Sequence, residues 1–555
     1  MASTEQGIGG VTSLHQRKLK RRVGLNALMF TSVGSIIGSG WLLGALTASK
    51  VAGPAALITW LLGAVAVLLI ALVHAELGGM FPVAGGSGRY PHYAFGGLVG
   101  FSSAWFWYIG AVTTAPAEVT AALTYANNYI PGLIDANTGV LTAPLGYIVA
   151  AILMILFSVI NVLGVRWLAE SNRWITAWKI AIPVLTVIVF LIVFHHFDNL
   201  SSHGFAPNGV APIFTALSTG VVFAYLGFEQ AVEFGAESAN PRRNIPLAVI
   251  GSVVLGVVIY LGLAIAFATS FEPSALAKGW SNLSFPGSFG PYAAIASAAG
   301  LGWLAFLLYV DAVISPGGTG LLYVGSTARM SFGMARMRTV PDAFASLSER
   351  RVPVVSIVVA MVLGFAFLFP LPSWQTIIGI VTGATVLAYG MQPLTLGALR
   401  RQAPDHDRPY RLQLAEIISP VAFVVANLII YWSTWTVVWK LMLAVLVGYL
   451  ILAVGSLVRP QATRPQLDWR AGYWLLPYLG GLTLISYVGA QDFGGTGLFP
   501  FGWDALIVAV FSVAIYVLAI RLRLPDATAE KYMTELSAEA ESEEEELGEL
   551  GVVSA

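Results

Sequence analysis

The feature that most limits the fold of this chain is a series of long apolar segments. Segments of about 18 or more residues recur from Leu25 to Leu522, and each is long enough to cross roughly 30 Å of hydrocarbon as a helix. Of the 555 residues, 57% are hydrophobic and only 10% are charged, whereas about a quarter of a soluble domain is charged. The sequence therefore predicts a membrane protein.

Helices are the expected spanning elements, because the alternating pattern and short segments of an outer-membrane barrel are absent. We therefore predict an all-α polytopic fold with about 14 transmembrane helices. The expected spans are residues 25–48, 54–80, 96–126, 142–165, 168–194, 212–236, 246–270, 291–328, 353–371, 374–399, 413–433, 436–456, 473–490 and 502–523.

The basic residues predict the orientation of these spans. Apart from Lys50, Lys179, Lys278 and Lys440, the Lys and Arg residues fall in the N-terminus, in alternate loops and in the C-terminal tail. By the positive-inside rule these regions are cytoplasmic, so we expect a multi-pass protein of the cell membrane with both termini inside. The basic segment 1–24 leads into an apolar run too long for a signal peptide, which we interpret as a retained first span.

Several classes of function are disfavoured by what the sequence lacks. It contains no cysteine, so it has no disulfides, thiolate metal ligands or cysteine nucleophiles. The H-E-x-x-H and G-x-S-x-G motifs are absent, and no basic and aromatic stretch suggests nucleic-acid binding. We expect no enzyme activity, cofactor or metal. The acidic segment 524–555, with one aromatic residue, is predicted to be a disordered cytoplasmic tail.

Two expected spans are interrupted in the middle. The first carries "GSIIGSG" at 34–40, and the sixth carries "AYLGFEQ" at 224–230. Gly34 and Gly38 alone fit a packing face of small residues equally well, but the consecutive small residues 38–40 favour an unwound turn. With four spans between them, the two interrupted spans run in opposite directions. Paired interruptions of this kind are typical of a transporter binding site.

Five stretches together resemble amino acid permeases of the amino acid–polyamine–organocation superfamily. They are "GSIIGSG", "AELGGMFPVAGGSGRYPHYAFG", "FAYLGFEQAVEFGAESANPRRNIP", "RMSFGMARMRTVP" and "LRRQAPDHDRPYR". The resemblance implies a LeuT-type fold with two inverted five-helix repeats, at 25–194 and 212–399, followed by additional helices at 413–523. Within the superfamily, the run "GFEQAVEFGAESANP" and the extra C-terminal helices are most similar to aspartate–proton symporters.

The interruptions predict how an amino acid is bound. An unwound first span leaves amide N–H groups free at the start of its outer half, where the helix dipole also favours an anion. We assign Ser39 and Gly40 to the substrate carboxylate, as the resemblance also implies. The carbonyl groups of Ile36, Phe223 and Leu226 are expected to receive the ammonium group, and the ring of Phe223 is a candidate lid over the substrate.

A row of glutamates follows the second interruption. If the sixth span breaks at Gly227, Glu229 begins the inner half-helix, where it would face the positive end of the helix dipole and a hydrated vestibule. We expect Glu229 to act in proton sensing or gating. For Glu233 and Glu237 we favour the simpler interpretation that they cap the helix or line an exposed inner face.

Lys179 is a charged residue in the middle of an expected span. Inserting a lysine near the bilayer centre costs about 2.5–3.5 kcal/mol of free energy on insertion scales. Lys179 lies too far into its span to reach an interface easily. In proton-coupled relatives, the resemblance implies, a lysine here fills the space that sodium takes elsewhere. Burial disfavours the charged form of a lysine, so we expect Lys179 to load and release the coupling proton against Ser315 and Thr319.

Three further polar residues lie within expected spans. Asp311 is equally consistent with pairing to a neighbouring helix and with a second proton-carrying role beside Lys179, and the "SPGG" segment at 315–318 is expected to open the helix locally. Glu118 is a candidate for lining the outer pathway, although the resemblance gives it little support. His74 is interpreted as a packing residue.

Together these features predict a secondary active transporter that couples amino acid uptake to protons by alternating access. Its partners are an amino acid, a proton and the lipid bilayer, without nucleic acid; the oligomeric state is left open. Lys179 favours symport over sodium coupling, and as a buried cation it favours aspartate or glutamate, followed by small neutral amino acids. The alternatives are an exchanger of neutral amino acids and a non-transporting amino acid sensor.

Overall fold

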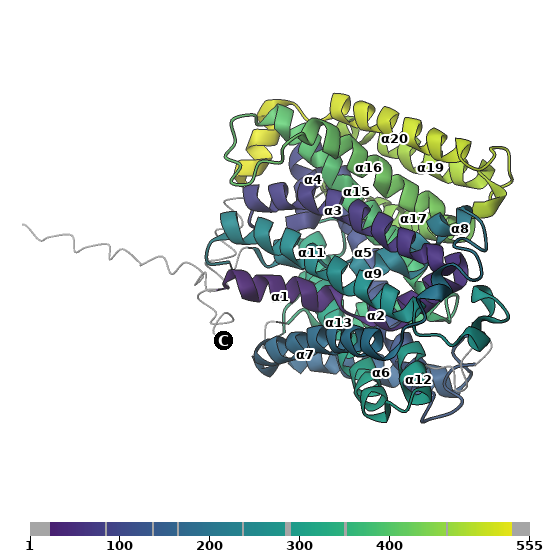
Figure 1. The fold of residues 1–555 in the computed structure, drawn as a ribbon. Coiled ribbons are helices and arrows are strands. Elements are labelled where there is room, and N and C mark those ends of the chain that lie inside the picture. The colour runs from purple at the N-terminus through teal and green to yellow at the C-terminus, as the bar shows by residue number, and fades with distance from the viewer. Residues whose placement is uncertain are drawn as a thin grey trace, which may run out of the picture.

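The chain folds into a bundle of helices (Figure 1). The computed structural model describes residues 23–83, 86–135, 138–163, 166–235, 238–283, 290–348, 352–461 and 464–535. No strand occurs in this part of the chain, and ten helical segments are long and apolar enough to cross a membrane. The predicted all-α polytopic fold is confirmed, whereas the count of about 14 spans remains a prediction.

The bounds of the α-helices follow the predicted spans closely. They are α1 (Leu25–Ile36), α2 (Ser39–Ala52), α3 (Ala56–Met80), α4 (Gly86–Phe95), α5 (Gly97–Ala126), α6 (Leu145–Leu163), α7 (Arg166–Val193), α8 (Ala211–Ala216), α9 (Val222–Tyr225), α10 (Gln230–Glu233), α11 (Pro241–Ala268), α12 (Pro291–Ala298), α13 (Gly302–Arg336), α14 (Val354–Phe367), α15 (Trp374–Gln402), α16 (Ala415–Trp432), α17 (Trp435–Val458), α18 (Trp469–Gly472), α19 (Leu475–Val488) and α20 (Trp503–Leu522).

Both predicted breaks are present. The first span is interrupted at Ile37 and Gly38, between α1 and α2, and the sixth at residues 226–229, between α9 and α10. Gly227 has φ of 115°, which side chains other than glycine rarely adopt. The sixth span contains a further irregularity that the sequence did not predict, a π-helical turn at Leu217–Val221 with non-helical angles at Thr219 and Gly220.

The predicted span 291–328 differs from the structure, which divides it into α12 and α13. The helix stops after Ala298 because Gly300 adopts a positive φ of 74°, a common way to end a helix. Helix α13 then runs without interruption through Pro316. The predicted opening at "SPGG" is therefore wrong.

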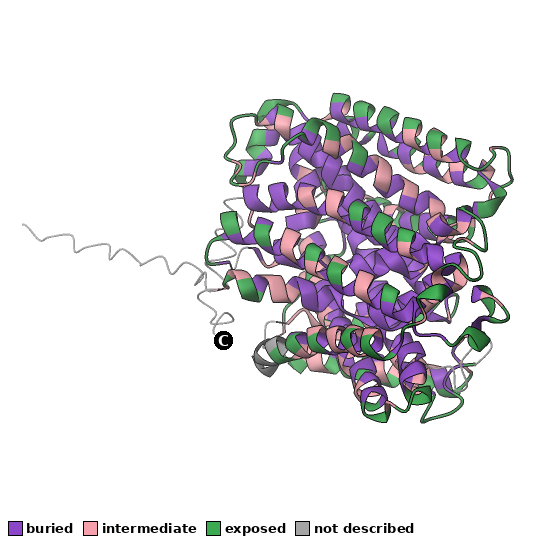
Figure 2. Ribbon diagram, in the orientation of Figure 1, coloured by how far each residue is buried: buried purple, intermediate pink, exposed green. Residues whose placement is uncertain are grey.

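Burial separates a central helix from a lipid-facing surface. In α15 every residue from Ile377 to Leu399 is buried, and α5 packs between α15 and α13. Outer helices such as α6 and α17 expose apolar side chains, for example Ile152 and Leu450, and Figure 2 shows the same change from buried centre to exposed rim. Exposed apolar faces are expected where lipid, not water, surrounds the helices.

The predicted disordered tail is partly ordered. Residues 526–535 are helical, and Ala529 and Tyr532 are buried against neighbouring residues. The Tyr532 hydroxyl donates to Asp468 at 3.0 Å, and the Leu524 amide donates to the Ala94 carbonyl at 3.0 Å. Apolar residues spaced three apart give this segment one packing face, which overrides its acidic composition. Residues 536–555 lie outside the described part.

Candidate functional site

A small cavity lies where the two helix breaks meet α5, α13 and α15. It is lined by Ser35, Ile36, Gly38, Gly40, Thr114, Glu118, Phe223, Leu226, Thr319, Tyr323, Val381 and Thr385. The space open to a water-sized sphere is about 10 Å³, and one water already needs roughly 10–15 Å³. The cavity is therefore closed in this conformation, and the surrounding helices must move apart to admit an amino acid.

The start of α2 already holds a carboxylate. The Ser39 amide donates to Glu118 Oε2 at 2.8 Å, and the Ser39 hydroxyl accepts from Trp374 Nε1 at 2.9 Å. A Cβ atom on Gly38 would lie 2.7 Å from Glu118 Oε1, so glycine at this position lets the carboxylate reach the main chain. The first amides of a helix lack partners within the helix, and here a side chain from α5 supplies one.

The six predicted substrate-binding residues lie together around the two breaks. Ile36, Gly40, Phe223 and Leu226 line the cavity. A Cβ on Gly40 would lie 2.8 Å from the Cα of Ala224, so the two interrupted spans meet with their main chains in contact. Their binding roles remain predictions.

The carbonyl groups proposed for the ammonium group are partly occupied. The Ile36 carbonyl accepts from the Tyr260 hydroxyl at 2.9 Å, and the Phe223 carbonyl accepts from the Leu226 amide at 3.2 Å. The Ile36 carbonyl also accepts from the Gly38 amide at 3.1 Å, so both of its lone pairs are used and one of these two bonds must break before it can bind an ammonium group. The Phe223 carbonyl retains one lone pair. The ring of Phe223 packs edge-on against Trp374, with the ring centroids 5.8 Å apart.

Lys179 is buried and hydrogen-bonded beside the first break. Its ammonium donates to the Gly34 carbonyl and to Thr319 Oγ1, both at 2.8 Å, and its exposed fraction is 2%. It also interacts electrostatically with Glu118. A Cβ on Gly318 would lie 3.2 Å from Lys179 Cε, so this glycine of "SPGG" makes room for the lysine and does not open α13.

Of the two hydroxyl partners predicted for Lys179, the structure places only Thr319 against it. The Ser315 hydroxyl instead donates to Asp311 Oδ1 at 2.8 Å, and Trp41 Nε1 donates to Asp311 Oδ2 at 3.1 Å. Asp311 is thus held by α2 as well as by its own helix, and it also interacts electrostatically with Lys179. This contact fits the interpretation that Asp311 pairs with a neighbouring helix.

Glu229 stabilises the second break. Its Oε2 atom accepts from the Gly227 amide at 3.0 Å and from the Tyr389 hydroxyl at 2.5 Å, and its Oε1 atom accepts from the Tyr323 hydroxyl at 3.3 Å. Glu229 is fully buried, so the expected hydrated vestibule is wrong for this state. The reason is that the Tyr389 and Tyr323 hydroxyls bind its carboxylate oxygens in place of water. In addition, α10 has only four residues and offers little helix dipole.

The remaining predicted residues near the second break have simpler surroundings. His74 is buried and packs edge-on against Phe228 and Tyr389, with centroids 5.1 Å away in both cases, as expected for a packing residue. Glu233 is half-buried and interacts electrostatically with Arg329. Glu237 lies outside the described residues.

Two of the stretches that resemble permeases meet at one end of the bundle. Glu76 of α3 is fully buried, and it accepts from Arg400 at 3.0 and 2.6 Å and from the Leu412 amide at 2.7 Å. Arg408 Nε lies 3.3 Å from the same carboxylate. This cluster joins the end of α3 to the end of α15 and to the segment that follows it.

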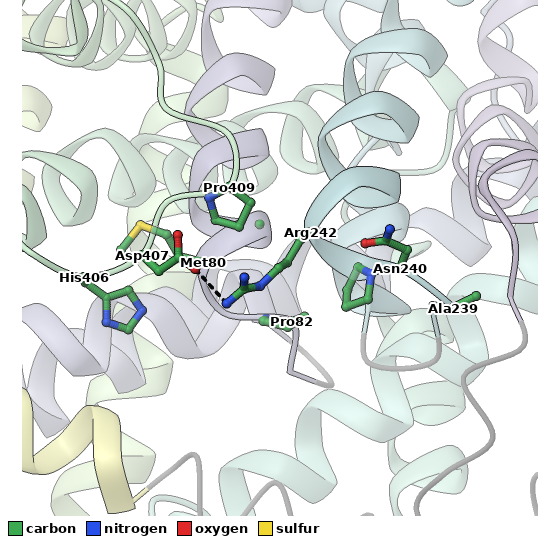
Figure 3. Close-up of a pocket in the computed structure, with 10 residues that line it drawn as sticks. Met80, Pro82, Ala239, Asn240, Arg242, His406, Asp407 and Pro409 are labelled. Carbon is green, nitrogen blue, oxygen red and sulfur yellow. Dashed lines mark ion pairs between the residues drawn. The ribbon is translucent and has the colours of Figure 1, made fainter.

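A second cavity, of about 500 Å³, opens beside this cluster between α3, the start of α11 and the segment after α15 (Figure 3). Arg242 and Asp407 form an ion pair of 2.7 Å across it. Both side chains are about two-thirds exposed, so the pair stabilises the fold by only about 0–1 kcal/mol. Burial and the neighbouring Arg408 guanidinium lower the pKa of His406 in its wall. This cavity shares no lining residue with the cavity at the breaks.

Most of the polar partners around the breaks were not predicted from the sequence. Glu118 carried a usable signal, since a carboxylate in the middle of an apolar span is as costly as Lys179. No sequence feature distinguished Trp374, Tyr323 and Tyr389, because aromatic residues are common throughout this chain. Their roles depend on which faces of α13 and α15 turn toward the breaks.

Comparison with known proteins agrees with this architecture. The family model described as amino acid permease matches residues 23–518. A glutamate/serine transporter of Bacillus subtilis is 37% identical over 91% of this chain and 94% of its own length. An aspartate-proton symporter of the same organism is 34% identical over 92% of this chain and 98% of its own. An aromatic amino acid transport protein of Corynebacterium glutamicum is 26% identical over 73% of this chain. The chain is thus an integral membrane protein that belongs to the amino acid permease family.

Proposed function

We propose that this protein is a secondary active transporter that takes up an amino acid together with a proton by alternating access. The observation that carries the proposal is the arrangement at the first break, where the amide at the start of α2 already binds a carboxylate and lies near a buried lysine. Main-chain donors suit a substrate carboxylate, and a buried amine that holds its proton reversibly suits proton coupling. Thr319 connects these two groups, because it lines the cavity and its hydroxyl accepts from Lys179.

The substrate is bound mainly by main-chain groups. The amides of Ser39 and Gly40 receive its carboxylate, and the carbonyls of Ile36, Phe223 and Leu226 receive its ammonium group. Gly227, with its positive φ, supplies the turn that interrupts the second span beside the carbonyls of Phe223 and Leu226. A zwitterion is then held without a dedicated ion pair, and the transporter releases it when the half-helices move apart.

Proton coupling depends on side chains behind the first break. Lys179 loads and releases the proton while bonded to Thr319. Asp311, held by Ser315, adds a negative charge that favours the ammonium form of Lys179. Glu229 acts in gating, because its carboxylate and two tyrosine hydroxyls must separate if the second break opens.

An acidic amino acid is the favoured substrate. The two Bacillus subtilis relatives are described as a glutamate/serine transporter and an aspartate-proton symporter. Among the described residues, Lys179 is the one fully buried lysine, and it is bonded to a residue of the cavity wall. We infer that aspartate and glutamate are transported. Serine is the first neutral amino acid to test as an alternative substrate.

The basic loops support an orientation with both termini in the cytoplasm of a cell membrane. In this orientation α1 and α10 lie on the cytoplasmic side of the breaks, and α2 and α9 lie on the outer side. We further propose that residues 25–194 and 212–399 form two inverted repeats, with the additional helices at 413–523 packed against them.

Uptake into proteoliposomes tests the function. Labelled aspartate, glutamate and serine are offered to sodium-free vesicles with and without an imposed proton gradient. We expect accumulation of an acidic amino acid that depends on the gradient and stops when a protonophore is added. Exchange for internal amino acid without any effect of the gradient would instead support an antiporter.

The lysine is tested in the same vesicles. Lys179→Ala should abolish gradient-driven accumulation, whereas Lys278→Ala, which removes an exposed loop lysine, should leave it intact. Accumulation in Lys179→Ala that still followed the proton gradient would contradict the assigned role. A sodium requirement at fixed pH would contradict the choice of coupling ion.

A further inference from the structure

We propose that Glu118 occupies the substrate carboxylate's binding site in the substrate-free protein and leaves it on taking up a proton, so that one proton binds with each substrate. The inference rests on the proposed function, because it takes the amides of Ser39 and Gly40 as the groups that receive the substrate carboxylate. It makes the substrate and a side chain of the protein competitors for the same donors.

The geometry at the first break carries this inference. Glu118 Oε2 accepts from the Ser39 amide at 2.8 Å, and Oε1 lies 2.7 Å from the position of a Cβ on Gly38. The side chain is 1% exposed, and it reaches the break from a different helix. A side-chain carboxylate and a substrate carboxylate are the same chemical group, and a single N–H cannot serve both at full strength.

The balance of charge explains why a proton is needed. When a substrate arrives, its α-carboxylate lies in the same cavity as the carboxylate of Glu118, and two carboxylates that share a buried site cannot both remain ionised. Lys179 is the only cation that the described residues place nearby, and it is already bonded to Gly34 and Thr319. An acidic amino acid brings one ammonium group and two carboxylates, so together with Lys179 and Glu118 there are two cations and three anions. A proton on Glu118 removes the uncompensated negative charge.

Other titratable groups around Glu118 are less suited to take this proton. Helix α11 contributes Tyr260, whose hydroxyl donates to Ile36, and α13 contributes Tyr323 at the cavity wall. Asp311 of α13 faces Lys179 but accepts from Trp41 and Ser315. Helix α15 contributes Val381 and Thr385, which do not titrate. The proton is therefore shared between Glu118 and Lys179.

The proton transfer can be written so that it balances. The ammonium of Lys179 gives a proton to the Glu118 carboxylate, which leaves a neutral amine and a carboxylic acid. The amine then takes a proton from the aqueous side from which the substrate entered. The net change is one proton for each substrate, and the new O–H of Glu118 becomes a donor toward the incoming carboxylate. Release reverses these steps on the other side.

Substrate binding to the purified protein tests the inference. Binding of the amino acid identified by uptake is measured over a pH series, together with proton uptake in weakly buffered solution. We compare wild type with Glu118→Gln, which retains an oxygen acceptor for Ser39 but cannot ionise, and with Glu416→Gln at an exposed glutamate of α16. Wild type and Glu416→Gln should take up a proton on binding and lose affinity by about tenfold per pH unit on the alkaline side.

Glu118→Gln should bind substrate without proton uptake and without this pH dependence. It should also exchange substrate across vesicles while losing gradient-driven accumulation. Proton uptake and a pH slope equal to those of wild type would overturn the inference. If wild type accumulates substrate with the gradient and Glu118→Gln does so equally, this inference fails while the proposed function stands. If wild type shows no gradient-driven accumulation, the proposed function fails, and the binding data still decide the role of Glu118.

Infrared difference spectroscopy provides a test that does not depend on the folding of a variant. Addition of substrate to wild type should produce the band of a protonated carboxyl group, and Glu118→Asp should shift that band. Absence of the band from wild type at a saturating concentration of substrate would overturn the inference. A purely structural glutamate would give no such signal.

Discussion

The two helix breaks hold buried carboxylates in different ways. At the first break the Ser39 amide binds Glu118, a residue 79 positions away on α5. At the second break the Gly227 amide binds Glu229, only two positions away. Both carboxylates satisfy main-chain donors that an interrupted helix leaves without partners.

The difference in sequence distance has a mechanical consequence. Glu229 belongs to the turn that it stabilises, so it travels with the break, and Tyr389 and Tyr323 hold it in place. Glu118 belongs to another helix, so a shift of α2 relative to α5 separates it from Ser39. We infer that the first break can exchange its carboxylate for that of a substrate, whereas the second cannot.

Among the substitutions at the breaks, Gly227→Ala is expected to have the largest effect, a loss of folding stability. The new methyl group would lie 2.8 Å from the carbonyl carbon of Ser35 and 2.9 Å from the Ile36 amide nitrogen, and φ at this position is 115°. The strain costs about 1–3 kcal/mol, and forcing an extra methyl group into a packed site adds about 1–3 kcal/mol. The melting temperature in detergent measures this loss, with Gly480→Ala in an open position as the control. An unchanged melting temperature would show that the second break is not rigid.

Gly38→Ala should act on transport more than on folding. Its methyl group would lie 2.7 Å from Glu118 Oε1 and 3.0 Å from Thr319 Oγ1, and these side chains can turn away. Displacing Glu118 from Ser39 removes a hydrogen bond to a charged group, worth about 1.5–3 kcal/mol. We expect uptake to fall at least about tenfold in protein that still folds. If Gly38→Ala unfolds the protein as readily as Gly227→Ala, the two breaks are mechanically alike and the comparison fails.

The sequence predicted those parts of the fold that depend on local composition. Apolar length predicted α3, α5, α7 and α15 to within a few residues at most ends. Consecutive small residues predicted the first break, and the stretch "AYLGFEQ" predicted the second. It did not predict the division of span 291–328, where one backbone angle at Gly300 decides the end of a helix. Nor did it predict order in residues 526–535, which depends on a surface supplied by other segments.

The candidate site was less predictable, because it depends on how the helices are rotated against each other. The cost of a buried charge was sufficient to single out Lys179, and its contact with Thr319 is present. The same reasoning noted Glu118 without assigning it a partner. Its contact with Ser39 is set by the packing of α5 beside α2, and no pattern within either segment encodes that packing. Tyr389 reaches Glu229 for the same reason.

Glu229→Gln sharpens the comparison, because it repeats the Glu118→Gln change at the second break. The amide has one acceptor oxygen in place of two, so the Gly227 amide and the Tyr323 hydroxyl can no longer both donate to this side chain. We expect a loss of stability of about 1–3 kcal/mol with the pH dependence of substrate binding retained. Thermal unfolding and the binding series over pH measure the two effects. Loss of the pH dependence in this variant would mean that Glu229, and not Glu118, is the carboxylate that binds the coupling proton.

Trp374→Phe is expected to have the smallest effect, a modest rise in the KM for uptake. It removes the donor to the Ser39 hydroxyl but keeps an aromatic ring beside Phe223. One neutral hydrogen bond is worth about 0.5–1.5 kcal/mol, so the KM for uptake should rise about two- to tenfold. Trp439→Phe, at an exposed tryptophan of α17, serves as the control. Because the hydroxyl is not the group assigned to the substrate carboxylate, Trp374→Phe should affect uptake less than Gly38→Ala. The reverse order would mean that the position of the Ser39 side chain governs substrate binding, and that the competition between Glu118 and the substrate for the Ser39 amide is secondary.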